Sequence, residues 1–227
     1  MARGPVRKPV VLSWSGGKDS ALALDALSRD PAFEVVGLLT SVTREYNRIS
    51  VHGVRRSMLE AQVERLGLPL FEIALNPGCT NDEYEAGFRA TLQQIKLNQP
   101  DVAHIAFGDL FLSDVRAYRE RLLVGSGFDP IFPIWGLDTA SLARRFIADG
   151  FVARLVCVDT TQLDAAFAGR VFDERLLADL PATVDPCGER GEFHTFVSDA
   201  PSFRGSIPHR VGQMVLRDDR FMFCDLE

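Results

Sequence analysis

Residues 9–27 read PVVLSWSGGKDSALALDAL and join a strand pattern to a helix pattern through two glycines. Pro9–Leu12 is an apolar run of strand length, whereas the residues after Lys18 repeat apolar side chains at the spacing of an amphipathic helix. Gly16 and Gly17 lie in the turn between the two patterns. A helix N-terminus offers unpaired backbone N–H groups and a partial positive charge, and glycines let an anion approach the backbone. The stretch therefore predicts a phosphate-binding loop between a buried strand and a helix.

The spacing of the glycines indicates which kind of phosphate loop this is. Walker loops and dinucleotide-binding loops need other glycine spacings, and neither pattern is present. Ser15-Gly16-Gly17-Lys18-Asp19-Ser20 instead resembles the PP-loop signature of the N-type ATP pyrophosphatases. Members of that superfamily cleave ATP between the α- and β-phosphates, pass AMP to an acceptor oxygen and release pyrophosphate. An ordinary turn between a strand and a helix is the alternative interpretation.

The composition is that of a globular protein. The chain has 227 residues, 46% of them hydrophobic and 25% charged, with a net charge of −6. The acidic balance argues against general nucleic-acid binding. The apolar runs are of strand length, and the first residues lack the apolar stretch of a signal peptide, so we expect no membrane span and a cytoplasmic protein. Four scattered cysteines without a Cys-x-x-Cys pair exclude a zinc ribbon and a redox dithiol, and we expect reduced thiols.

Strand-like and helical patterns alternate through the first half of the chain. We expect strands at 10–13, 33–40, 69–75 and 102–107 and helices at 18–29, 54–66 and 83–97. This alternation predicts an α/β fold with a doubly wound parallel sheet. Such sheets bind ligands at the carboxyl ends of their strands, where the strand order reverses.

Gly108-Asp109-Leu110 follows the fourth expected strand. If the first and fourth strands are neighbours, Asp109 lies opposite the glycine-rich loop, where a carboxylate can ligate Mg²⁺ or orient an acceptor. The alternative for Asp109 is a simple helix cap.

The pattern changes near Gly127. An aromatic, proline-rich segment leads to a helix capped by Asp138 or Thr139, and strands are expected at 151–158, 210–216 and 221–224. We therefore predict a PP-loop domain at 1–127 and a second, smaller α+β domain that binds the acceptor at 128–227.

A second motif lies at 187–197, with the sequence CGERGEFHTFV. Glu189 and Glu192 could polarise a nucleophile or hold Mg²⁺, and His194 could move a proton near neutral pH. A polar hairpin whose carboxylates bind backbone amides is the alternative.

Together the two motifs resemble the diphthine–ammonia ligase family. The resemblance spans roughly residues 9–205 and includes the PP-loop, Gly108-Asp109-Leu110, Arg119, Pro133-Ile134-Trp135 and the 188–193 segment. It implies an adenine nucleotide α-hydrolase-like domain followed by a distinctive C-terminal domain. The enzyme that names the family adenylates the carboxylate of diphthine on elongation factor two, and ammonia then displaces AMP to give an amide.

The resemblance and the motifs together assign roles to residues. Catalytic roles fall to Lys18, Asp109, Glu189, Glu192 and His194. ATP would be bound by Ser13, Ser15, Gly16, Gly17, Lys18, Asp19, Ser20, Thr40 and Gly108. The acceptor would be bound by His52, Arg119, Trp135 and Thr195, and Mg²⁺ by Asp19 and Asp109.

The second motif also departs from the family pattern. In the diphthine enzymes an acidic residue stands at the position of His194 and a glycine at that of Arg190. A bacterial branch of the family carries the Phe-His-Thr form, so a small-molecule acceptor, such as one related to cobamides, stays open beside diphthine. ATP-dependent RNA thiolation, a non-catalytic ATP-sensing module and a homodimer are also left open.

Overall fold

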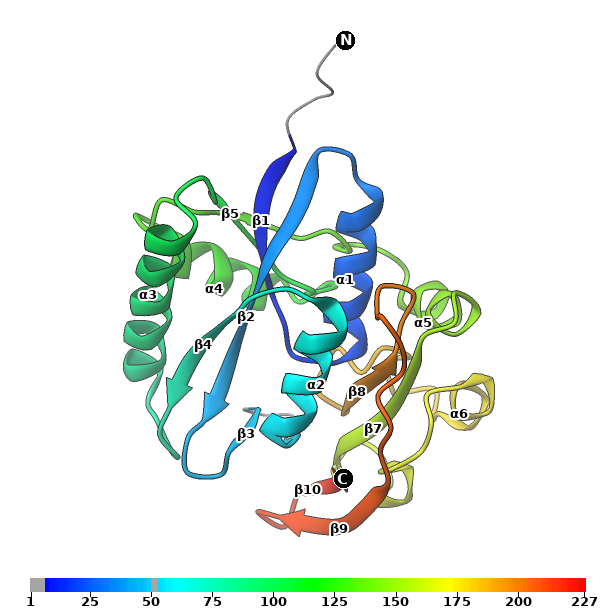
Figure 1. Ribbon diagram of the computed structural model, residues 1–227. Helices are drawn as coiled ribbons and strands as arrows, with labels where there is room; N and C mark the ends of the chain where they lie inside the picture. The colour runs from blue at the N-terminus through cyan, green and yellow to red at the C-terminus, as the bar shows by residue number, and fades with distance from the viewer. Residues whose placement is uncertain (1–6, 50–52) are drawn as a thin grey trace.

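Two β-sheets from different parts of the chain organise the fold (Figure 1). A computed structural model describes residues 7–49 and 53–227. The strands are β1 (Lys8–Ser13), β2 (Phe33–Thr43), β3 (Arg48–Ile49), β4 (Leu70–Leu75), β5 (His104–Ala106), β6 (Asp129–Ile131), β7 (Val152–Asp159), β8 (Phe193–Asp199), β9 (Val211–Arg217) and β10 (Phe221–Leu226). The helices are α1 (Lys18–Arg29), α2 (Arg56–Leu66), α3 (Asn81–Asn98), α4 (Ser113–Leu123), α5 (Thr139–Ala148) and α6 (Glu174–Asp179), with a 3-10 turn at Ala165–Phe167.

The first sheet is parallel in its main part. Strands β4, β2, β1, β5 and β6 lie side by side in that order, and the short β3 adds an antiparallel pairing to β2. Leu12 of β1 pairs with Leu38 on one side and Ala106 on the other. The strand order reverses between β1 and β5, so the loops after these strands lie together at the carboxyl edge. This order confirms the expected doubly wound α/β fold and the neighbouring first and fourth expected strands.

Local sequence signals fix several helix ends. Thr80 and Glu83 form a reciprocal capping box at the start of α3. Asp138 caps α5 by accepting the backbone N–H of Ser141. Gly67 ends α2 in the left-handed conformation, with φ of 67°. These three signals are readable in the sequence, whereas α4 and β8 were not among the expected elements.

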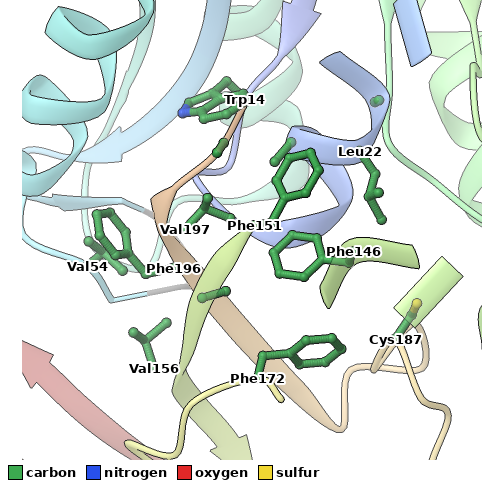
Figure 2. Close-up of a cluster of buried hydrophobic side chains, with 14 of the residues drawn as sticks. Trp14, Leu22, Val54, Phe146, Phe151, Val156, Phe172, Cys187, Phe196 and Val197 are labelled. Atoms are coloured by element: carbon green, nitrogen blue, oxygen red, sulfur yellow. The ribbon is translucent and has the colours of Figure 1, made fainter. Parts of the chain in front are cut away.

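Helices cover both faces of the first sheet. Helices α1 and α2 lie between it and the second sheet, and α3 and α4 cover the opposite face (Figure 1). The larger core joins the two sheets: Figure 2 shows Trp14 and Leu22 from the first layer beside Phe146, Phe151 and Phe196 from the second. Burying a large apolar side chain contributes roughly 1.5–3 kcal/mol, so this shared core holds the two layers together.

The second sheet is antiparallel, in the order β8-β7-β10-β9. Its strand β8 runs along α1, so the second motif sits directly beside the PP-loop (Figure 1). Strand β6 pairs with β5, so residues 129–131 belong to the first sheet. The chain therefore enters the second sheet only after this strand, and the division of domains between residues 127 and 128 stays a prediction.

Candidate active site

A cavity of about 320 Å³ opens at the carboxyl edge of the first sheet, against β8. Its walls come from the PP-loop, the ends of β2 and β5, helices α3 and α4, and the loop before β8. Thirteen of the residues to which the sequence assigned a role line it: Ser13, Ser15, Gly17, Lys18, Asp19, Ser20, Thr40, Gly108, Asp109, Arg119, Glu189, His194 and Thr195. The fold thus brings residues far apart in sequence to one cavity.

The PP-loop turns directly into α1. Gly17 is the N-cap residue, and its carbonyl accepts the hydroxyl of Ser20 at 2.9 Å. The hydroxyl of Ser15 accepts the backbone N–H of Gly17 at 3.3 Å. No side chain caps α1 from within the helix, so its first amides depend on partners from outside. One such partner is Thr195 of β8, whose hydroxyl oxygen accepts the backbone N–H of Lys18 at 3.0 Å.

Lys18 places a buried positive charge beside the loop. Its side chain is 3% exposed, and Nζ lies 2.8 Å from a carboxylate oxygen of Asp19. Nζ also lies 5.5 Å from the centre of the Phe193 ring, within cation–π range. Burial by itself lowers the pKa of Lys18, but Asp19, Cys187 and Glu189 together more than offset it and raise this pKa. Lys18 therefore stays charged, as neutralising a phosphate requires.

Asp109 faces the PP-loop from the end of β5. The preceding Gly108 packs so closely that a Cβ there would lie 2.9 Å from the backbone of Asp19, so the two loops touch. A carboxylate oxygen of Asp109 lies 3.6 Å from Nε of Arg119. Burial raises the pKa of Asp109, the nearby charge of Arg119 opposes the rise, and Asp19 adds to it.

These two carboxylates fit a magnesium ion bound together with phosphates. Mg²⁺ is usually held by one or two carboxylates plus substrate oxygens and waters. Oδ2 of Asp109, the oxygen that lies 3.6 Å from Nε of Arg119, is buried without a hydrogen-bond partner, and Asp19 lines the same cavity. Within residues 7–49 and 53–227, no group of three or more His, Cys, Asp or Glu residues could hold a metal ion without the nucleotide.

Glu189 is anchored at the cavity wall by one of its oxygens. Oε1 accepts the backbone N–H groups of Leu110 at 2.7 Å and Phe111 at 3.4 Å. Burial raises the pKa of Glu189 to about 7 despite these hydrogen bonds, and Asp19 adds to the rise. The carboxylate of Glu189 is thus poised to exchange a proton near neutral pH.

Glu192 lies outside the cavity wall. It is 1% exposed, and its two oxygens accept the backbone N–H groups of Asp185 at 2.8 Å and Arg190 at 2.9 Å. Asp185 in turn accepts the N–H groups of Cys187 at 2.9 Å and Glu189 at 3.3 Å. The interpretation of Glu192 as a group that contacts substrate is therefore corrected, because both carboxylate oxygens hold the loop that carries Glu189.

Two other assigned residues that the structure describes, Gly16 and Trp135, do not line the cavity. Gly16 forms the underside of the PP-loop, with its carbonyl accepting the N–H of Val197 at 2.9 Å. Trp135 packs beside Phe132 and the guanidinium of Arg116, outside the cavity wall. The assignment of Trp135 to the acceptor site stays a prediction. His52 lies outside the described residues.

Apolar side chains of β4, α3 and the end of β5, which the sequence did not indicate as site residues, complete one wall of the cavity beside Leu39. This wall comprises Leu39, Ile73, Tyr84, Phe88 and Phe107. The guanidinium of Arg119 reaches it, with Nη1 at 3.5 Å from the hydroxyl of Tyr84. Tyr84 and Phe88 stand four residues apart on α3, a spacing that reads in the sequence as an ordinary core face. An apolar wall with aromatic side chains suits a nucleobase.

Cys187 is not a nucleophile in this site. It is fully buried, and its thiol donates to the carbonyl of Thr139 at 3.4 Å. Burial raises the pKa of Cys187 to about 12, with the carboxylates around it adding to the rise against the effect of Lys18. Reactive cysteines carry a lowered pKa, so this thiol is structural.

Comparison with known families decides where the chain belongs. Its residues 8–130 match the family model described as the diphthamide synthase N-terminal domain, and residues 138–215 match that of the diphthamide synthase C-terminal domain. The chain belongs to the diphthamide synthase family. The resemblance to the diphthine–ammonia ligases that the two motifs indicated is thereby confirmed.

Two curated relatives of this family carry the same name. The chain is 25% identical over 212 residues to a diphthine–ammonia ligase of Schizosaccharomyces pombe, an alignment that covers 85% of this chain and 34% of the relative. It is 26% identical over 222 residues to a diphthine–ammonia ligase of Homo sapiens, which covers 85% of this chain and 79% of the relative. The chain thus spans about a third of the length of the yeast protein. Among the described residues, no helix is long and apolar enough to cross a membrane.

Proposed function

We propose that this chain uses ATP to adenylate an acceptor carboxylate and converts it to an amide with ammonia. The observation that carries the proposal is the shared cavity, in which the loop that resembles a PP-loop faces Asp109 and Glu189. The family models and the names of both relatives support an ATP-dependent amide ligase. They give no support to RNA thiolation or to ATP sensing without chemistry. The expected setting of the reaction is the cytoplasm.

The PP-loop side of the cavity would bind the phosphates. The serine hydroxyls and the amides at the start of α1 would contact the β- and γ-phosphates, with Lys18 neutralising the charge that builds on the departing pyrophosphate. Asp19 and Asp109 would hold Mg²⁺, which supplies further charge neutralisation on the phosphates. The apolar wall around Tyr84 and Phe88 would take the adenine.

The first chemical step joins the acceptor to AMP. A carboxylate oxygen of the acceptor attacks the α-phosphorus, a new phosphorus–oxygen bond forms, and the bond to the β-phosphate breaks to release pyrophosphate. In this step the protein mainly supplies positioning and charge stabilisation. Arg119 stands at the cavity wall between Asp109 and Tyr84, where its guanidinium can orient an anionic acceptor.

The second step transfers ammonia to the activated acyl group. Nitrogen attacks the acyl carbon, the carbon–oxygen bond to AMP breaks, and protons are lost from nitrogen. Glu189 would take a proton, because its carboxylate lies at the cavity wall and titrates near pH 7. His194 lines the same side and would contact the acceptor. The first candidate for the acceptor is diphthine on elongation factor two. The second candidate is a small carboxylic acid, because His194 lines this part of the cavity.

Analysis of the nucleotide products tests the proposal. Purified protein is incubated with Mg-ATP and ammonium, in one arm with diphthine-bearing elongation factor and in the other with a small-molecule filtrate of cytosol. AMP and pyrophosphate in either arm would support adenylation and show which acceptor class is used. AMP formation in neither arm, or ADP as the product, would contradict it.

Two variants make the product assay specific. Lys18→Ala is expected to lower AMP formation by about a hundredfold, because it removes a charge aimed at the leaving group. Lys8→Ala is the matched control, since Lys8 is an exposed residue of β1 that lies outside the cavity. Equal loss in both variants would contradict the role of Lys18.

A further inference from the structure

A buried glutamine lies beneath the PP-loop. Gln62 comes from the middle of α2, is 0% exposed, and does not line the cavity. Its side-chain oxygen Oε1 accepts the indole N–H of Trp14 at 3.0 Å. Its Nε2 donates to the carbonyl of Gly16 at 2.9 Å and to the carbonyl of Val197 at 2.7 Å. One side chain thus joins α2, the end of β1, the PP-loop and β8.

The orientation of this carboxamide is fixed by its partners. An indole N–H can only donate, and the two backbone carbonyls can only accept. Oxygen must therefore face Trp14, and both N–H donors of Nε2 must face Gly16 and Val197. Glutamate has no donor when ionised, and an aliphatic side chain has neither a donor nor an acceptor. Among side chains of this length, only glutamine makes all three hydrogen bonds.

The contact lies at the most unusual backbone position of the loop. Gly16 has a φ of 79°, in the left-handed region that favours glycine. A Cβ at Gly16 would lie 2.6 Å from Oε1 of Gln62, so the glutamine fills the space under the turn. With its carbonyl held inward by Gln62 and by the N–H of Val197, Gly16 leaves Gly17 and Lys18 facing the cavity.

We infer that Gln62 is a positioning residue that holds the PP-loop in its phosphate-binding shape through the carbonyl of Gly16. Gln62 acts on ATP only through the loop. That the loop binds the phosphates of ATP rests on the proposed function. The same carboxamide binds Val197, two residues along β8 from Thr195, which accepts the N–H of Lys18. Strand β8 therefore holds the loop at two points, through Val197 at Gly16 and through Thr195 at Lys18. The same strand lines the cavity.

The test compares Gln62→Met with Thr91→Val. Methionine keeps the length of the side chain and removes its three hydrogen bonds. Thr91 is also buried, and its hydroxyl donates to the carbonyl of Gly87 at 2.9 Å on α3, on the other face of the sheet. Both variants lose buried hydrogen bonds, so both are expected to lower the melting temperature. Only Gln62→Met is expected to disturb the PP-loop.

Two readouts separate positioning from stability. Well below both melting temperatures, Gln62→Met is expected to weaken Mg-ATP binding at least about tenfold by calorimetry, because small misplacements of a binding loop are costly. Hydrogen exchange of the 13–20 peptide is expected to accelerate at least about tenfold in the same variant. Thr91→Val is expected to match the unaltered protein in both. Equal ATP affinity and equal exchange in the two variants would overturn the inference.

The outcomes for the inference and for the proposed function are separable. If the unaltered protein binds no ATP, the proposed function fails, but exchange of the 13–20 peptide still decides whether Gln62 holds the loop. If Gln62→Met does not fold, Gln62→Glu replaces it with a side chain of the same shape. Its protonated form regains one donor, so its loop exchange is expected to slow as the pH is lowered from 8 to 6, relative to the unaltered protein. Identical pH dependence in the two proteins would overturn the inference.

Discussion

Gly16→Ala tests how tightly the PP-loop is built. The change adds a methyl group at a residue with φ of 79°, and that methyl group would lie 2.6 Å from the side-chain oxygen of Gln62. Gly78→Ala is the matched control. Gly78 has a φ of 68°, but nothing lies within 4 Å of the position that its Cβ would take. The two variants share the backbone penalty and differ only in the contact.

The expected cost follows from these two features. A left-handed conformation costs a residue with a Cβ about 1–2 kcal/mol, which is the whole effect expected at Gly78. At Gly16 the methyl group must also displace Gln62, which makes three buried hydrogen bonds. Each such bond contributes about 1 kcal/mol, so losing two or three of them adds about 2–3 kcal/mol. Gly16→Ala is therefore expected to lower the free energy of unfolding by about 3–5 kcal/mol.

Urea unfolding monitored by circular dichroism measures both variants, and equal slopes with urea would show that the comparison is valid. A second prediction concerns the double variant Gly16→Ala/Gln62→Met, which should lose less stability than the sum of its two single changes, because both remove the same contact. If Gly16→Ala costs no more than Gly78→Ala, the packing argument for Gln62 and the PP-loop is wrong.

Other predictions concern the carboxylates. Burial raises the pKa of Glu189 to about 7, so the fraction of ionised base grows with pH, and kcat for amide formation is expected to rise between pH 6 and 8. For Glu189→Gln, kcat is expected to be low and not to change over the same pH range. Glu192→Gln should lower the melting temperature and leave the KM for ATP unchanged, since its oxygens bind backbone amides outside the cavity. The Arg220 guanidinium holds the pKa of Asp159 below its usual range, so Arg220→Met should lower the free energy of unfolding at pH 7. The difference in free energy between the variant and the unaltered protein should shrink as the pH falls below about 4, and acid unfolding measures it.

The sheet order and the loop were predictable because their signals are local. Strand-length apolar runs, the glycines of the PP-loop and the capping pair of α3 each act over a few residues. Once the first and fourth expected strands are neighbours, Asp109 must face the loop. The sequence therefore predicts that the PP-loop and the loop with Asp109 form facing walls of the cavity.

The division of labour in the second motif could not be read from the sequence. Glu189 and Glu192 are three residues apart in one loop, and which carboxylate reaches the cavity depends on the backbone path that Asp185 fixes by accepting two amides. Gln62 reads as an ordinary polar residue of an amphipathic helix. Its full burial results from the second sheet packing across α2, which no local pattern reveals.

Oxygen transfer from the acceptor to AMP would be the chemical signature of adenylation. The acceptor that gives AMP in the product assay is labelled with ¹⁸O in its carboxylate and turned over with Mg-ATP and ammonium, and the AMP is analysed by mass spectrometry. Adenylation predicts one ¹⁸O atom in the phosphate of each AMP, because an acceptor oxygen forms the bond to phosphorus and stays there when ammonia displaces the nucleotide. Unlabelled AMP, with both labelled oxygens left on the acceptor, would contradict the account.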